Sequence, residues 1–218
     1  MAEIDRLQRA ASALGQAMLV LSSVIFCVVL VVNQPFVHWL GVPNSPYAGD
    51  LLTGLLLLAM IARHANFAVV FTLFSLGGER RISLTTLADG AITVVGTVLL
   101  VRRFGLIGAP IASLIGATIV SLPANFRGLA ARAGIPVIHW LRPLWSWAWR
   151  FVVLASGAAL VTRVNIAPTF IALAITSTLV AGIVALVMLP VLIRPPLGQY
   201  LVPRLSRFIP GILRDNRA

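Results

Sequence analysis

Apolar and polar residues occur in long separate blocks along this chain. Six mainly apolar stretches, separated by shorter polar segments, lie at 13–32, 51–76, 83–101, 105–122, 146–162 and 168–193. A helix needs about 20 apolar residues to cross the hydrocarbon core of a bilayer, which is about 30 Å thick. The pattern therefore predicts an all-α, polytopic membrane bundle of about six transmembrane helices over residues 1–193. Residues 194–218, with five arginines and four prolines, are predicted to form a basic cytoplasmic tail.

The second stretch, 51–76, is interrupted near its middle by Arg63, His64 and Asn66. These residues could form a polar turn between two shorter segments, but each half would then have only about a dozen residues, too few to span. Arginines collect in the short loops on the cytoplasmic side of a membrane protein. With one helix over 51–76 and the N-terminus inside, thirteen arginines lie inside and three outside, whereas a split helix leaves six inside and eleven outside. The single helix is favoured, and it places Arg63 within the membrane.

The composition and charge of the chain indicate which partners surround it. Hydrophobic residues make up 59% of it, charged residues 11%, and the mean hydropathy is +0.99. All 17 basic residues are arginine and there are six acids, giving a net charge of +11. In a soluble protein this charge would suggest nucleic acid, but here the arginines flank apolar stretches, so the expected partners are membrane lipids and not nucleic acid.

The arginine distribution also predicts orientation, with both termini in the cytoplasm. Residues 1–12 mix acidic and basic side chains and lead directly into a full-length apolar stretch. This is not the pattern of a cleavable signal peptide, so the first helix is expected to be retained.

The third stretch carries polar residues at helical spacing. Thr86, Asp89, Thr93 and Thr97 are three, four and four positions apart, which places them on one face of a helix. A carboxylate in hydrocarbon costs about 2.5–3.5 kcal/mol, so Asp89 should face the bundle interior or a water-filled cavity. At about 1.5 Å per residue, Asp89 and Arg63 both lie about 12 Å from the inner boundary. We therefore predict an ion pair between them that faces the bundle and not the lipid.

This pair has two interpretations. It could serve only to neutralise both charges and fix helix packing, or its residues could line a hydrophilic cavity for a substrate. The second interpretation draws on the further polar side chains nearby, and its candidate cavity-lining residues are Arg63, His64, Asn66, Thr86, Asp89 and Thr93.

The sequence gives little indication of a catalytic site or a metal site. Asp89 is the only acid within a predicted span, so a mechanism with two intramembrane carboxylates is not available and no enzyme activity is expected. None of the three histidines has a second His, Cys or acid at ligand spacing, so neither a metal site nor a cofactor is predicted.

Two further patterns concern packing and the interface. Gly108, Ala112 and Gly116 recur every four residues, which allows another helix backbone to approach the fourth stretch closely. The segment 131–151 carries four of the five tryptophans among arginines. Because tryptophan prefers the headgroup level, we expect this segment to lie along the inner interface before the fifth span begins.

Several stretches, taken in order, resemble the C-terminal half of polysaccharide-export flippases, the O-antigen and exopolysaccharide members of the multidrug/oligosaccharidyl-lipid/polysaccharide exporter superfamily. They are "NQPFVHWLGVPNSPYAGDLLTGLLLLAMIARHAN", "SLGGERRISLTTLADGAITVVGTVLLVRRFGLIGAPIASLIGATIV" and "ARAGIPVIHWLRPLW". The resemblance covers residues 10 to 165. In that family the acid near Asp89 is more often a glutamate, so this chain departs from the pattern there.

The resemblance implies a fold and a function. It implies one lobe of a flippase-like transporter in the bacterial inner (plasma) membrane, which exports an undecaprenyl-pyrophosphate-linked oligosaccharide for polysaccharide biosynthesis, lipopolysaccharide included. Such flippases have two lobes with the substrate between them. The implied partners are therefore the lipid-linked oligosaccharide and a missing N-terminal half or a second copy. The alternative is a non-transporting membrane scaffold subunit of a polysaccharide-synthesis complex.

Overall fold

The computed structural model describes residues 2–41, 49–164 and 166–205, and every regular element in these ranges is a helix. The elements are α1 (Ala2–Trp39), α2 (Gly49–Ser75), α3 (Glu79–Phe104), η1 (Gly105–Ile107), α4 (Gly108–Ile115), η2 (Gly116–Ser121), α5 (Leu122–Ala133), α6 (Val137–Val161), α7 (Phe170–Ile193) and α8 (Gly198–Leu205). The predicted all-α class is confirmed.

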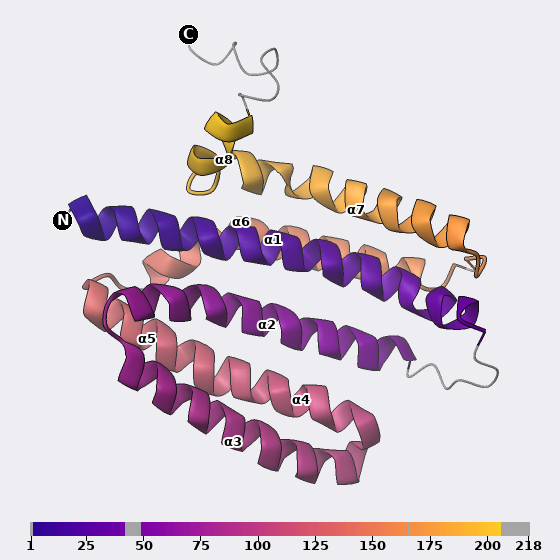
Figure 1. The fold of residues 1–218 in the computed structure, drawn as a ribbon, viewed down its shortest axis with the longest axis horizontal. Coiled ribbons are helices and arrows are strands. Elements are labelled where there is room, and N and C mark those ends of the chain that lie inside the picture. The colour runs from indigo at the N-terminus through magenta and orange to yellow at the C-terminus, as the bar shows by residue number, and fades with distance from the viewer. Residues whose placement is uncertain (1, 42–48, 165, 206–218) are drawn as a thin grey trace.

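Five continuous helical stretches in the described residues are long and apolar enough to cross a membrane. The third of them, Glu79–Ala133, reverses direction at the short turn η1, where Gly105 has a φ of 63°. Beyond this turn α4, η2 and α5 run back along α3 as one rod (Figure 1). The described chain therefore forms six rods, which agrees with the six apolar stretches of the sequence.

The helix α2 passes without interruption through Arg63, His64 and Asn66. The prediction of one long second helix, not two short ones, is confirmed. Arg63 lies near the middle of this helix, 14 residues after Gly49 and 12 before Ser75.

The fifth rod differs from its prediction. The helix α6 begins at Val137, nine residues before the expected start at residue 146, and it continues to Val161 without a break. Residues 137–151 of the Trp-rich segment, with all four of its tryptophans, are therefore the first part of α6 and are continuous with the predicted span. Pro143 lies inside the helix, and its carbonyl oxygen accepts a hydrogen bond from Nε2 of Gln16 at 3.0 Å, which ties this part of α6 to α1.

The helix α1 is the centre of the bundle, with α2, α6 and α7 packed around it (Figure 1). The rod α4–η2–α5 packs against both α2 and α3, so α3 lies on the far side of the bundle from α7. The main core lies between α1, α2, α6 and α7. Its buried residues are Leu19, Val20, Phe26, Cys27, Leu30, Val31, Leu57, Ile61, Phe151, Ala158, Val184, Met188 and Val191.

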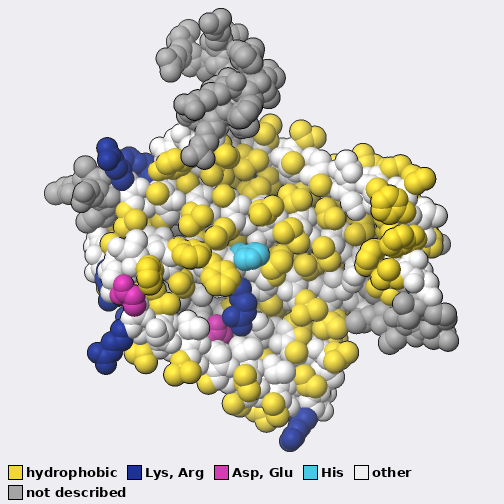
Figure 2. All heavy atoms as spheres, in the orientation of Figure 1, with side chains coloured by type: hydrophobic (Ala, Val, Ile, Leu, Met, Phe, Trp, Pro, Cys, Tyr) yellow, Lys and Arg dark blue, Asp and Glu magenta, His cyan; other side chains and the backbone are white. Residues whose placement is uncertain are grey.

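The outer faces of the helices are covered with large apolar side chains (Figure 2). Leu87, Leu106, Ile171 and Leu186 are each at least 70% exposed. Soluble monomers rarely expose a continuous apolar surface of more than a few hundred Å². This surface is suited to contact with lipid.

The two ends of the bundle differ in charge. The arginine-rich end, where α1 begins, carries Arg6, Arg9, Arg80, Arg81, Arg127, Arg132, Arg142 and Arg194 near helix ends. The opposite, arginine-poor end carries Arg102, Arg103 and Arg163. Of the predicted basic tail, residues 198–205 form α8, and residues 206–218 lie outside the described part of the chain.

Arg150, which is one of the thirteen arginines predicted to lie on the inner side, is within a helix and not in a loop. It lies 13 residues into α6, next to Phe151, whose ring contacts Phe26 in the middle of the core. Its guanidinium extends back along the helix and donates a hydrogen bond of 2.7 Å to the hydroxyl of Ser146, and it also lies over the ring of Trp149. A long side chain can thus carry its charge toward the interface from a deeper backbone position.

Candidate functional site

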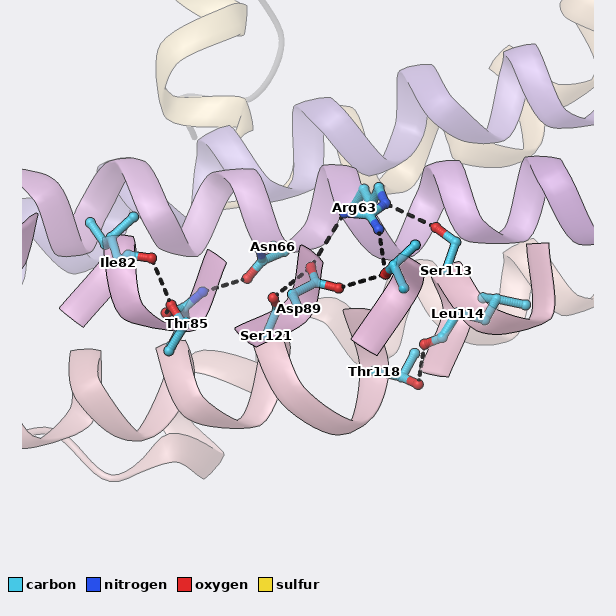
Figure 3. Close-up of polar contacts among 11 residues, drawn as sticks. Arg63, Asn66, Ile82, Thr85, Asp89, Ser113, Leu114, Thr118 and Ser121 are labelled. Atoms are coloured by element: carbon cyan, nitrogen blue, oxygen red, sulfur yellow. Dashed lines mark hydrogen bonds and ion pairs between the residues drawn. The ribbon is translucent and has the colours of Figure 1, made fainter. Parts of the chain in front are cut away.

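An intramembrane ion pair joins α2 to α3. The Nη1 atom of Arg63 lies 3.3 Å from Oδ2 of Asp89, so the predicted pair is present (Figure 3). The other two nitrogens of the guanidinium donate to hydroxyl groups, Nε to Ser113 on α4 at 3.0 Å and Nη2 to Thr93 on α3 at 3.5 Å. Arg63 therefore connects three helices at one level of the bundle.

The two partners of this pair have very different surroundings. The Asp89 side chain is 6% exposed, and both of its oxygens have further donors, since Oδ2 accepts from Ser121 at 2.8 Å and Oδ1 from Thr93 at 3.1 Å. The Arg63 side chain is 39% exposed. Of the five N–H donors of a guanidinium, Arg63 directs three to described partners and leaves two unused. Each oxygen of the carboxylate thus has at least one donor, and the cation retains capacity to bind.

A π-helical turn, η2, forms the wall against Asp89. Gly116 and Ser121, its first and last residues, both contact this carboxylate: Ser121 donates a hydrogen bond, and the Cα of Gly116 lies so close that a Cβ would collide with Oδ1 of Asp89. In an α-helix these two residues would point about 140° apart, because successive residues differ by about 100°. The wider π turn brings both toward the acid, and such turns occur often at functional sites.

The predicted small-residue stripe is confirmed as a packing surface. Gly108 lies against the backbone of Leu100, and Ala112 is 1% exposed and contacts the position of Gly96. Gly116 continues the stripe to Asp89. The close approach of α4 and η2 to α3 is what encloses the carboxylate.

Arg63 opens onto a groove of about 540 Å³ between α2, α3 and α4. Its polar lining comes from Arg63, His64, Thr93, Thr97 and Ser113, and its other walls are apolar. Figure 2 shows basic, acidic and histidine side chains gathered in the middle of an otherwise mainly apolar and uncharged face. Asp89 faces the bundle interior as predicted, whereas Arg63 is 39% exposed and lines the open groove between α2, α3 and α4.

His64 lines the same groove and also contacts α1. Its Nδ1 lies 2.6 Å from Oγ of Ser22, whose hydroxyl also lies 2.7 Å from the carbonyl oxygen of Met18. A hydroxyl has a single hydrogen to donate. If Ser22 donates to Met18, Nδ1 of His64 carries the proton of the second bond, which leaves its Nε2 as an acceptor when the ring is neutral.

Asn66 belongs to a second polar network, closer to the arginine-rich end. Its Oδ1 accepts from Nδ2 of Asn125 on α5 at 2.9 Å (Figure 3). The hydroxyl of Thr85 on α3 lies 3.0 Å from Oδ1 of Asn125 and at the same distance from the carbonyl oxygens of Arg81 and Ile82, so its one hydrogen is shared among three acceptors. Asn125 is 1% exposed. Asn66 is therefore not among the groove-lining residues, and its role here is to hold α2 to α5.

Thr86 does not join either network. Its side chain is exposed and lies outside the groove, whereas its neighbour Thr85 is the residue that bonds Asn125. The polar face of α3 is formed by Thr85, Asp89 and Thr93 at a constant spacing of four. Measured from Asp89, Thr85 points about 40° to one side and Thr86 about 60° to the other, and only the first side faces α5.

Ser113, Ser121 and Asn125 are site residues that the sequence did not reveal. All three lie in the fourth rod, where single serines and asparagines among apolar residues carry no periodic signal. The described residues contain no group of three or more His, Cys, Asp or Glu side chains that could hold a metal ion.

Comparison of the chain with protein-family models, with curated proteins and with solved structures finds no match. The fold defines the class, a multi-pass, all-α membrane protein. The site adds a buried carboxylate and a half-exposed arginine within the membrane-spanning helices.

Proposed function

We propose that the chain is one half of a bacterial inner-membrane transporter that exports an undecaprenyl-pyrophosphate-linked oligosaccharide, with the Arg63 groove as its part of the substrate path. The observation that carries the proposal is the asymmetry of the ion pair. Asp89 is enclosed and satisfied, while Arg63 keeps two N–H donors and 39% of its side-chain surface open to the groove. Ionisable residues held inside a membrane commonly mark a substrate or ion pathway.

The chemistry of the groove suits an anionic substrate with hydroxyl groups. A guanidinium binds phosphate oxygens through its N–H donors, and hydrogen bonds to charged groups are stronger than neutral ones. His64, Thr93, Thr97 and Ser113 add donors and acceptors that can bind sugar hydroxyls. In this proposal Arg63 attracts the pyrophosphate or an acidic sugar, and Asp89 sets the position of Arg63 and competes with the substrate for it.

An open groove on one lobe needs a second wall, so the proposal includes a partner lobe that faces α2, α3 and α4. The proposal places both termini in the cytoplasm, because arginines collect on that side of a membrane protein and the end of the bundle where α1 begins is rich in arginine. A coding region directly upstream with six more spans would supply a candidate for this partner. A complete and unrelated gene there would favour the alternative, a scaffold subunit without transport activity.

The test is a reconstitution of the purified chain in proteoliposomes, alone and with the candidate partner. Transfer of a fluorescent undecaprenyl-pyrophosphate oligosaccharide between leaflets is read by quenching with membrane-impermeant dithionite. We expect transfer only with the partner. Replacing both charges, Arg63→Leu with Asp89→Leu, should lower the rate by roughly tenfold or more, because a hydrogen bond to a charged group contributes about 1.5–3 kcal/mol.

Arg102→Gln is the matched control, since it removes an arginine outside the groove at the arginine-poor end. It should leave transfer unchanged. Wild-type transfer by a folded double variant would refute the role of Arg63. Association with synthesis enzymes, without transfer by any combination of lobes, would support the scaffold instead.

A further inference from the structure

A second site lies at the arginine-poor end, away from the Arg63 groove. It begins as a polar recess of about 150 Å³ between the end of α1 and the segment after α6. Gln34 and His38 line it from α1, and Thr162 and Arg163 line it from the other side. The side chains of Gln34, His38 and Arg163 form no hydrogen bond or ion pair within the described part of the chain. Three polar side chains thus converge without partners among the residues that the structure describes.

The recess adjoins an apolar groove, because Thr162 and Arg163 line both. This groove, of about 420 Å³, extends from Arg163 toward the middle of the bundle between α2 and α6, which both pack against α1. The buried Phe26 and Leu30 of α1 line it from within. Its small residues, Gly54, Ala155 and Ala159, leave the space open.

We propose that this pair of cavities binds a bilayer phospholipid with a single negative charge, such as phosphatidylglycerol. Its phosphate would lie in the recess against Arg163, with Gln34 and His38 as further hydrogen-bond partners, and one acyl chain would lie in the apolar groove. The inference does not depend on the proposed transport function.

The reason for choosing a lipid is that the polar recess and the apolar groove share Thr162 and Arg163 as lining residues. A polar ligand alone would have no use for the apolar groove, and an apolar ligand alone would leave the cation and the amide unsatisfied. The groove has a volume within the range of ligand clefts, roughly 300–1,000 Å³. It starts near Leu51 and passes Leu58, which is a length of about 10 Å along α2, parallel to the acyl chains of a bilayer.

The charge of the site favours a monoanion. Asp50 also lines the groove, so the two cavities contain one acid and one arginine. A phosphodiester carries one negative charge, which a single arginine can balance, whereas a phosphomonoester or a pyrophosphate carries more.

The test is native mass spectrometry of the full, delipidated chain in detergent, titrated with phosphatidylglycerol, with zwitterionic phosphatidylcholine and with glycerophosphoglycerol, which keeps the phosphodiester of phosphatidylglycerol but has no acyl chain. We expect saturable binding of phosphatidylglycerol, weaker binding of phosphatidylcholine and no binding of glycerophosphoglycerol in the same range. Arg163→Gln should weaken phosphatidylglycerol binding by roughly fivefold or more, since an arginine near a lipid headgroup contributes about 1 kcal/mol. Arg102→Gln, with the same loss of charge at the same end, should not.

A second pair of variants tests the acyl chain. Ala159→Leu fills the groove and should weaken phosphatidylglycerol binding, while Ala185→Leu, on an exposed face of α7 outside the groove, should not. If Arg163→Gln and Arg102→Gln weakened phosphatidylglycerol binding equally, the effect would be one of surface charge in general, and the proposal would be overturned. Equally tight binding of glycerophosphoglycerol, or wild-type binding by Ala159→Leu, would overturn it as well, because either result removes the acyl chain from the site.

Discussion

Nη1 of Arg63 lies 3.3 Å from Oδ2 of Asp89, and the two residues come from the middle of α2 and α3. The acid is nearly enclosed, at 6% side-chain exposure, while the arginine is 39% exposed on an open groove. A pair that served only to neutralise two charges would be expected to leave few donors unused, because a polar group without a hydrogen bond costs free energy in an apolar environment. Here the enclosure stops at the carboxylate, and the cation remains available.

The first prediction concerns the coupling between these charges. Arg63→Leu or Asp89→Leu alone leaves one charge without its partner and should lower the free energy of unfolding by about 3 kcal/mol. The double variant should cost less than the sum of the two single variants. Arg63→Leu should be the more damaging single change, because the charge that it leaves behind is the buried one. A double-mutant cycle on unfolding in detergent measures the coupling, and simple additivity would contradict it.

The second prediction tests the close contact between η2 and Asp89. A Cβ at Gly116 would collide with Oδ1 of Asp89 and crowd the hydroxyl of Thr93, so Gly116→Ala should destabilise the protein by about 1–3 kcal/mol. Gly90 also lies in a helix, but a Cβ there would meet nothing within 4 Å. Gly90→Ala is the matched control and should be neutral or slightly stabilising. A lower melting temperature for Gly90→Ala than for Gly116→Ala would argue against the packing described here.

The third prediction separates two adjacent threonines on α3. Thr85 bonds the buried Asn125, whereas Thr86 is exposed and outside both networks. Thr85→Val should reduce stability by about 0.6–1.7 kcal/mol, the average and maximum measured for hydrogen bonds between membrane helices. Thr86→Val, which is the same chemical change, should have no measurable cost. Equal losses of stability in Thr85→Val and Thr86→Val would contradict this assignment and would support the polar face with Thr86 that the sequence predicted.

The fourth prediction concerns orientation in the membrane. The arginine-poor end should face away from the cytoplasm. In a Cys27→Ala background, Leu106→Cys at the η1 turn should react with an impermeant maleimide added to intact cells. Glu79→Cys, at the opposite end of α3, should react only after the cells are opened. The reverse labelling pattern would invert the orientation and place the proposed phospholipid site in the inner leaflet.

Much of the fold was predictable because the membrane imposes a simple length and polarity rule. The six apolar stretches correspond to the six rods, and the middle of α2 is helical despite Arg63, as the arginine distribution required. The rule does not predict where each helix begins and ends, because a helix can extend beyond the hydrocarbon core into the interface. For that reason α6 begins nine residues before its predicted start and includes the Trp-rich segment.

The sequence by itself determined the helical class and the meeting of Arg63 with Asp89, because a charge in hydrocarbon must find a partner and Asp89 is the only acid within a predicted span. Rotation about each helix axis was decided only by tertiary packing. That rotation selected Thr85 and not Thr86, brought Ser121 and Gly116 to Asp89 through a π turn, and left Arg63 on an open groove. These outcomes depend on the shapes of neighbouring helices, which a one-dimensional pattern of polarity does not contain.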